Sequence, residues 1–335
     1  MQKSDDIERA RVLADMARVA EQHQKTAKAK SLYDDALAQF AECSLDPFLP
    51  EVLRWKGTLL REKGETESAF RYYTKSLEKA TLIGSEAAMA HALNCLGTIA
   101  QRRGDQKETE RLYAQAAEFA ERARDSRLLG MIEQNRGALA SMRGDFGQAA
   151  AFYSNSLGAF EVAGDAEPMS WVLNNLGILH TKIGNFNEAR GHLERGRAIA
   201  VNRGDAVVEN VTTLNLAEVW MGLGRLDTAD KFCAIALEQA QRRGDHLSAA
   251  APSRFARLSS ASAARWTRAS PPFGSRSSKR KARRTACSRP RCFASCARSR
   301  VPWGTLEPRV RRGAEQSIPT RRSAPARRSP RSRPN

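Results

Sequence analysis

The chain has 335 residues, of which 41% are hydrophobic, so it is long and apolar enough to bury a sizeable core. No apolar run is long enough for a membrane-spanning helix, and the charged first twenty residues do not resemble a secretory signal. Residues 1–250 contain 32 Lys and Arg against 35 Asp and Glu, whereas residues 251–335 contain 23 against 2. The formal net charge of +18 therefore comes from the last part of the chain. Cys43, Cys95 and Cys233 lie singly in helical patterns, as buried thiols do, and we expect a cytoplasmic protein.

Small and aromatic residues recur in columns that share a period of 40 residues. The first column reads Ala17, Gly57, Gly97, Gly137, Gly177 and Ala217. The second column, seven residues further along, reads Gly64, Gly104, Gly144, Gly184 and Gly224. An aromatic column reads Tyr33, Tyr73, Tyr113 and Tyr153, followed by Leu193 and Cys233. Several columns with one period indicate tandem repeats, and we predict about six of them over residues 11–249.

Each repeat is predicted to form two helices. In the third repeat, residues 91–103 place Leu93, Leu96 and Ile99 on one face at helical spacing. Gly104 then favours a helix end, and a second helix is expected over residues 107–124. The small first column indicates a close helix crossing, and we expect the aromatic column to fill the space between neighbouring repeats. One helix pair cannot bury its apolar face alone, so the repeats are expected to stack.

Two segments carry a resemblance to a known family. LNCLGTIAQRRGDQKETERLYAQAAEFA (93–120) and LNNLGILHTKIGNFNEARGHLERGRAIA (173–200) resemble the tetratricopeptide repeat. The period of 40 exceeds the common repeat length of about 34 residues. It is similar to the extended repeats of maltose-activator-type transcription factors, kinesin light chains and Leu-Gly-Asn-repeat spindle-orientation proteins. The resemblance implies an all-α, right-handed superhelical solenoid of helix-turn-helix repeats.

The same resemblance assigns a concave ligand groove to the first helix of each repeat. It places the candidate peptide-binding residues two or three positions before the first-column residue, one position after it, and at further positions on the same helices. These candidates are Arg54, Trp55, Asn94, Thr98, Gln134, Asn135, Trp171, Asn174, Asn175, Asn215 and Glu218.

The asparagine column formed by Asn135, Asn175 and Asn215 supports two interpretations. A side-chain amide both donates and accepts hydrogen bonds, so repeated amides could hold the backbone of an extended peptide. The same amides could instead bond a neighbouring helix or face water, and both interpretations stay open. Trp55 and Trp171 are candidate peptide anchors, although single aromatic residues on apolar helix faces more often belong to the core. A clamp for a terminal carboxylate needs several cations and is not favoured, because only Arg54 and Lys182 are obvious candidates.

Nothing in the sequence predicts catalysis. The five histidines show no metal-ligand spacing, and no glycine-rich phosphate-binding motif follows a strand. We therefore expect no enzyme activity, no cofactor and no metal. The predicted function is a protein-interaction scaffold that binds a peptide or a partner helix in the groove. The alternative is a sensor or regulatory module of a signalling or transcriptional regulator, as a fragment of a larger protein.

Residues 250–335 are rich in Arg, Ser, Pro and Ala and lack a helical period, so we predict a disordered basic tail. KRKARR (279–284) is expected to attract nucleic acid or another polyanion only non-specifically. The cysteines of CSRPRCFASC (287–296) are a weak metal signal. The composition is also typical of GC-rich coding DNA translated out of frame. We hypothesise that the tail is the frameshifted product of two further repeats, which the nucleotide sequence would test.

Overall fold

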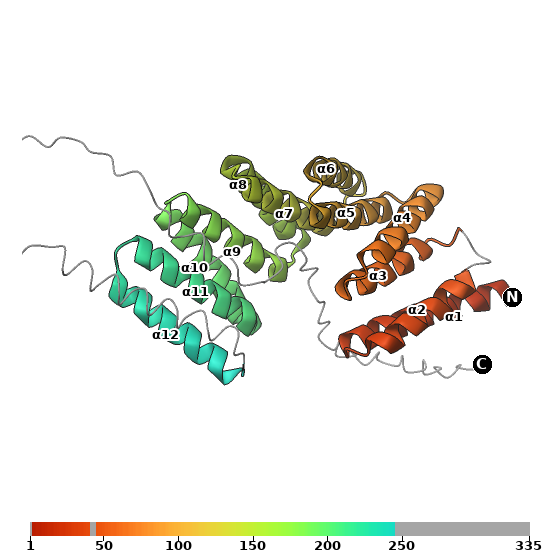
Figure 1. Cartoon of the computed structure of the whole chain (residues 1–335), viewed down its shortest axis with the longest axis horizontal. Coiled ribbons are helices and arrows are strands. Elements are labelled where there is room, and N and C mark those ends of the chain that lie inside the picture. The colour runs from red at the N-terminus through yellow and green to blue at the C-terminus, as the bar shows by residue number, and fades with distance from the viewer. Residues whose placement is uncertain (1, 41–44, 245–335) are drawn as a thin grey trace, which may run out of the picture. The chain divides into compact units, whose positions relative to one another are not determined.

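The structure, a computed structural model, describes residues 2–40 and 45–244, with side chains from residue 6 onward. Within these ranges all regular structure is α-helical (Figure 1). The twelve described helices are α1 (Gln2–Gln22), α2 (Thr26–Phe40), α3 (Leu49–Glu62), α4 (Thr66–Ile83), α5 (Glu86–Arg103), α6 (Gln106–Arg122), α7 (Ser126–Arg143), α8 (Phe146–Ala163), α9 (Ala166–Lys182), α10 (Phe186–Arg203), α11 (Ala206–Gly222) and α12 (Leu226–Arg242). The predicted basic tail and its frameshift origin lie outside the described residues.

Helix starts and ends repeat along the chain because the turn residues repeat. Side-chain oxygens accept hydrogen bonds from first-turn amides at the N-caps of five helices: Ser85, Asp105, Asp125, Asp145 and Asp205. The turns after many of the helices need a left-handed residue, and the second-column glycines all have φ between 73° and 85°. At two equivalent turn positions a non-glycine residue takes this conformation, Gln24 at φ 57° and Arg124 at φ 54°.

The helices pack as consecutive pairs. Each odd-numbered helix packs most extensively on the even-numbered helix that follows it, and each even-numbered helix up to α10 packs on the next odd-numbered one. Odd-numbered helices of successive repeats also contact each other, from α1 and α3 to α9 and α11. This consecutive packing is that of a helical-repeat solenoid, and it confirms the predicted helix-turn-helix repeats.

The first column marks a close helix crossing, as the sequence predicts. A Cβ atom added at Gly97 would lie 2.6 Å from ring carbons of Tyr113, and one at Gly57 would lie 2.7 Å from the ring of Tyr73. The aromatic ring therefore occupies the space between the two helices of one repeat. The expectation that this column fills the space between neighbouring repeats is incomplete, because its closest contact is with the first-column glycine of its own repeat.

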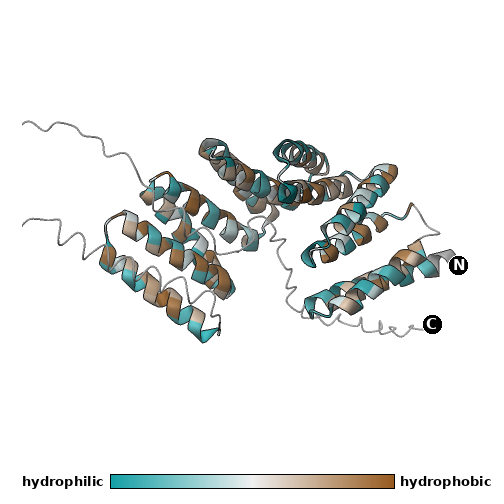
Figure 2. Ribbon diagram, viewed as in Figure 1, coloured by the Kyte–Doolittle hydropathy of each residue, from teal (hydrophilic) through white to brown (hydrophobic). Residues whose placement is uncertain are grey.

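The apolar core follows the helix pairs. Figure 2 shows apolar and polar residues alternating around the helices, as amphipathic segments require. The largest fully buried side chains include Tyr33, Tyr73, Tyr113, Phe40 and Phe160. Each repeat thus contributes its own part of a core that continues into the next repeat.

Candidate functional site

All eleven candidate residues lie on odd-numbered helices. Arg54 and Trp55 belong to α3, Asn94 and Thr98 to α5, and Gln134 and Asn135 to α7. The remaining candidates are on α9 (Trp171, Asn174, Asn175) and α11 (Asn215, Glu218). Because successive odd helices contact each other, these residues follow one another from repeat to repeat. We call the surface of α3, α5, α7, α9 and α11 that carries them the odd-helix face.

Two asparagine pairs connect neighbouring odd helices. The Asn135 side-chain amide donates a hydrogen bond to Oδ1 of Asn94 at 2.9 Å, and that of Asn215 donates to Oδ1 of Asn174 at 2.7 Å. Both acceptor residues are buried, whereas both donors are half-buried. These bonds give Asn135 and Asn215 a role between repeats, while each half-buried amide keeps further donor and acceptor capacity.

The middle pair of this series differs. Gln134 on α7 and Asn175 on α9 stand at the equivalent positions, 41 residues apart like the two asparagine pairs. Both are half-buried, and among the described residues neither has a side-chain hydrogen bond. The centre of the odd-helix face therefore presents two side-chain amides whose hydrogen-bonding groups are open to an incoming partner.

The aromatic candidates have different surroundings. Trp55 is half-buried, packs edge-to-face on Phe48 with ring centroids 5.3 Å apart, and lies under the guanidinium of Arg18 at 4.5 Å. It thus belongs partly to the core and partly to a cation–π contact on the surface. Trp171 is also half-buried. Thr98 is buried, and its hydroxyl donates a hydrogen bond to the backbone carbonyl of Asn94 in the same helix at 3.1 Å.

Arginines of two neighbouring odd helices influence each other electrostatically. Burial, followed by the charge of Arg61 on α3, lowers the pKa of Arg102 on α5, and Tyr73 opposes that change. Burial, followed by the charges of Arg54 and Arg127, lowers the pKa of His91 well below its usual value. Sequence reasoning missed the pair of Arg61 and Arg102, which also lies 41 residues apart. An anionic group would be stabilised there.

The fourth repeat contains an ion pair between a buried carboxylate and a half-buried arginine. Glu133 is 4% exposed, and its Oε1 accepts a hydrogen bond from Arg136 at 2.5 Å. The guanidinium of Arg136 also lies over the ring of Phe152, 4.2 Å from its centroid. Arg136 stands where the third and fifth repeats have Leu96 and Leu176, and these two contacts account for it.

The last two repeats contain a buried glutamate and a pair of stacked histidines. Burial raises the pKa of Glu218, and the charge of Lys182 opposes that rise. His180 of α9 and His192 of α10 stack with ring centroids 5.2 Å apart, although their spacing in the sequence does not indicate a pair. Burial, together with His180 and Arg195, lowers the pKa of His192. Within the described ranges, no group of three or more His, Cys, Asp or Glu side chains could hold a metal ion.

The repeats match known family models. Residues 89–124 and residues 128–200 each match a model of the tetratricopeptide repeat. The helical-repeat solenoid is thus the class of the fold, and the chain is a protein with tetratricopeptide repeats. Repeats of this family typically serve as non-catalytic scaffolds. No curated protein sequence matches the chain.

Solved structures share the fold at low sequence identity. The apo form of RapI is 12% identical, covers 77% of this chain and 99% of its own, and has a TM-score of 0.55. A Rap protein complexed with competence and sporulation factor is 14% identical, with 77% and 76% coverage and a TM-score of 0.55. A signal-transduction ATPase with a tetratricopeptide-repeat sensor, PH0952 from Pyrococcus horikoshii, is 13% identical and covers 75% of this chain but 38% of its own, with a TM-score of 0.61. Among the described residues, no helix is both long and apolar enough to cross a membrane.

Proposed function

We propose that the chain is a non-catalytic interaction scaffold whose odd-helix face binds an extended peptide or a partner helix. The observation that carries this proposal is the pair of half-buried amides at the centre of the face, Gln134 and Asn175, which make no side-chain hydrogen bond among the described residues. Amides in this state bond peptide N–H and C=O groups without selecting particular side chains. A structurally similar Rap protein was solved with a bound factor, so the fold accommodates such an occupant.

The charges of the face indicate which peptides bind best. Arg61 and Arg102 lie about one repeat from the central amides, on α3 and α5. Arg102 is exposed, so a carboxylate of the partner beside it would be attracted to its guanidinium. The preferred partner is therefore an extended segment with an acidic residue towards the second and third repeats.

The proposal includes a cytoplasmic location. Cys95 and Cys233 are buried and form no disulfide, and thiols in this state fit a reducing compartment. The alternative of a sensor module within a larger regulator stays a prediction. It requires a regulatory output that changes when the odd-helix face is occupied, whereas a scaffold requires only binding.

The test uses peptides selected from a random display library against the full chain. Affinities of the best peptides are then measured by fluorescence anisotropy for the wild type and for a Gln134→Ala, Asn175→Ala double variant. Loss of two peptide hydrogen bonds should weaken binding at least about tenfold. Asn155→Ala is the matched control, because Asn155 is an exposed amide on the even helix α8 and should leave affinity unchanged.

A second arm tests the charge preference. Arg102→Gln should weaken an acidic peptide more than its Glu-to-Gln counterpart, and it should flatten the dependence of binding on salt. Peptides that bind the double variant as tightly as the wild type would remove the central amides from the binding site. A library that yields no binder to the wild-type chain would contradict the proposal altogether.

A further inference from the structure

The fifth repeat contains a stacked pair of histidines at the contact between its two helices. His180 of α9 and His192 of α10 are both half-buried, and their ring planes are inclined by 30° at a centroid distance of 5.2 Å. Neither residue belongs to the candidate peptide-binding set on the odd-helix face. The proposed function therefore gives this pair no role.

The other repeats have no histidine at these two positions. The residues equivalent to His180 are Ala20, Leu60, Ala100, Ala140 and Trp220, and those equivalent to His192 are Leu32, Tyr72, Leu112, Phe152 and Phe232. In the last repeat the two positions also meet, because the rings of Trp220 and Phe232 lie 6.5 Å apart between centroids. The fifth repeat thus replaces an uncharged contact by two side chains that can each bind a proton near neutral pH.

Protonation is unfavourable while the two rings stay stacked. A charged imidazole carries a proton on both nitrogens, and Nδ1 of His180 is buried without a hydrogen-bond partner among the described residues. Burial, followed by the charges of His180 and Arg195, lowers the pKa of His192, while Glu188 opposes that change. Two charged rings at this distance would also repel each other. Rings that are separated and exposed to water escape these penalties.

The acidic groups of the surrounding helices offer little compensation, because most of them interact with other cations. Glu188, one turn before His192 on α10, is exposed, so solvent screens its charge. The others are Glu161 of α8 with Arg195, Glu167 of α9 with Arg203, Glu194 of α10 with Arg190, Glu209 of α11 with Arg197, Glu133 of α7 with Arg136, and Glu218 of α11 with Lys182.

We propose that the His180–His192 stack is an acid-sensitive contact, and that proton uptake by the two rings makes α9 and α10 separate locally. The opened helix pair exposes both rings to water, whereas the closed stack excludes at least one proton. Exclusion of one proton favours the opened form about tenfold at about pH 5.5 relative to about pH 7.5, because the usual histidine pKa is about 6.5. The contact is therefore intact above this pKa and weakens as the pH falls below it.

This device goes beyond the proposed function, although it involves a helix of the odd-helix face. Helix α9 also carries Trp171, Asn174 and Asn175, and Asn174 accepts the bond from Asn215 on α11. A partner that binds only the packed form of α9 would suppress the acid-induced opening, because coupling between two equilibria is reciprocal.

Hydrogen exchange of the full chain, without any peptide, tests the contact at about pH 7.5 and about pH 5.5, on either side of the usual histidine pKa. After correction for the intrinsic pH dependence of exchange, amides of α9 and α10 should exchange at least about tenfold faster at the lower pH. Amides of α7 and α8, which contain no histidine, should not. His91→Gln is the control, because it removes the histidine of α5 and should leave the effect in α9 and α10 unchanged.

A His180→Ala, His192→Phe double variant gives the fifth repeat the residues of the fourth, Ala140 and Phe152, and should abolish the increase. Circular dichroism shows whether this variant is folded, and His192→Phe alone, which should reduce the increase, decides the matter if it is not. Equal corrected exchange at both pH values overturns the proposal. So does an increase that persists in the folded variants, or one that is as large in α7 and α8. Because no peptide is used, these outcomes are independent of those that test the odd-helix face.

Discussion

The contact between the first column and the aromatic column predicts that one substitution, Gly97→Ala, destabilises the chain when Tyr113 is present and stabilises it when the ring is removed. Gly97→Ala would place a Cβ atom 2.6 Å from two ring carbons of Tyr113, about 1 Å closer than a carbon–carbon contact allows. Such overpacking lowers the free energy of unfolding by about 3 kcal/mol, whereas replacing glycine by alanine inside a helix raises it by about 1 kcal/mol. We therefore expect Gly97→Ala to reduce the free energy of unfolding by about 2 kcal/mol.

The last repeat shows how the cost is removed, because there Ala217 stands in the first column and Cys233 replaces the tyrosine. Tyr113→Cys alone should cost about 3–5 kcal/mol, since Tyr113 is fully buried and its ring leaves a cavity. In that background the clash is absent and the helix propensity of alanine remains. Gly97→Ala should then raise the free energy of unfolding by about 0.5–1 kcal/mol.

Urea unfolding followed by circular dichroism in reducing buffer measures all four chains of this double-mutant cycle. Repeat one pairs Ala17 with Tyr33, and there no described even-numbered helix precedes α1, whereas α5 packs on both α4 and α6. An equal loss of stability on Gly97→Ala in both backgrounds would refute the steric argument. So would a Gly97→Ala chain as stable as the wild type.

Three further outcomes follow from the backbone, the caps and the buried histidine. Arg124 is exposed and left-handed, so Arg124→Gly should raise the free energy of unfolding by about 0.5–1 kcal/mol, whereas Gly164→Ala at the equivalent turn should lower it by about 1 kcal/mol in urea unfolding. Asp145→Ala should cost about 1 kcal/mol by removing the N-cap bond to an α8 amide, and Asn185→Ala, which breaks no cap bond, should cost less. Because burial lowers the pKa of His91, the unfolded chain binds the proton first, and stability should fall as pH drops below the usual value of 6.5; His91→Gln should make thermal unfolding less sensitive to acid.

Much of the fold is predictable from the column pattern. Turn glycines such as Gly104 sit where the chain needs a positive φ, and small residues such as Gly97 sit where helices cross, so both leave a direct trace in the sequence. The partner of Gly97 leaves no such trace. Each residue of the aromatic column lies at a fixed number of residues from the first-column residue of its own repeat and also from that of the next repeat. The column pattern therefore fits a contact with either one. Only packing shows that the ring of Tyr113 lies against the helix of its own repeat.

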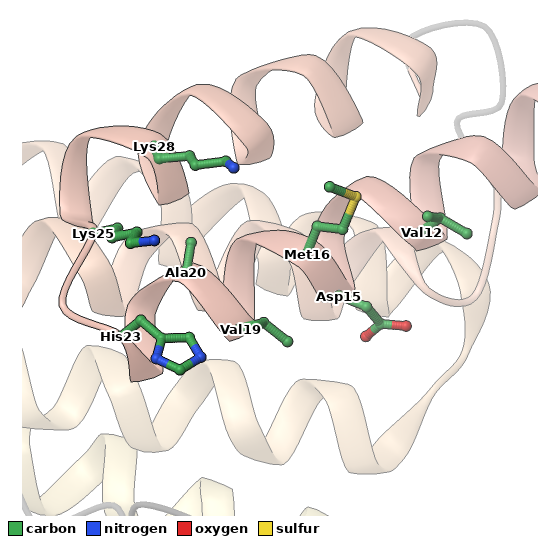
Figure 3. Close-up of a pocket in the computed structure, with 8 residues that line it drawn as sticks. All are labelled: Val12, Asp15, Met16, Val19, Ala20, His23, Lys25 and Lys28. Carbon is green, nitrogen blue, oxygen red and sulfur yellow. The ribbon is translucent and has the colours of Figure 1, made fainter.

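The exposed apolar side of α1, formed by Val12, Met16 and Val19 (Figure 3), could be predicted in part. Val12 and Val19 belong to columns without charged residues, and the sequence alone assigns both to the core by the same rule as their counterparts in later repeats. The Met16 column gives no such assignment, because it contains Lys56 and Arg136. A column rule cannot say that the covering element is missing, because the rule assumes that each repeat has a neighbour. The exposure of Val12, at 57%, is therefore information that the structure adds.

The sequence places the candidate site residues on helices that the structure confirms. It does not show which of these side chains pair across neighbouring repeats, because that depends on an offset of one residue from the period of 40. The side chains that pair across successive odd helices are 41 residues apart, as Asn94 and Asn135 are, because each contact joins one position of a repeat to the next position along in the following repeat. The asparagine column is consequently not one ladder but one side of three separate rungs. Two rungs pair an asparagine with an asparagine and close at 2.9 and 2.7 Å. The middle rung pairs Gln134 with Asn175, which form no side-chain hydrogen bond among the described residues, and glutamine is one methylene longer than the asparagine at the equivalent position of the other rungs. A chain that replaced Gln134 by Asn would be expected to close this rung and to lose peptide affinity, because the shorter amide would then bond inside the solenoid rather than to a partner.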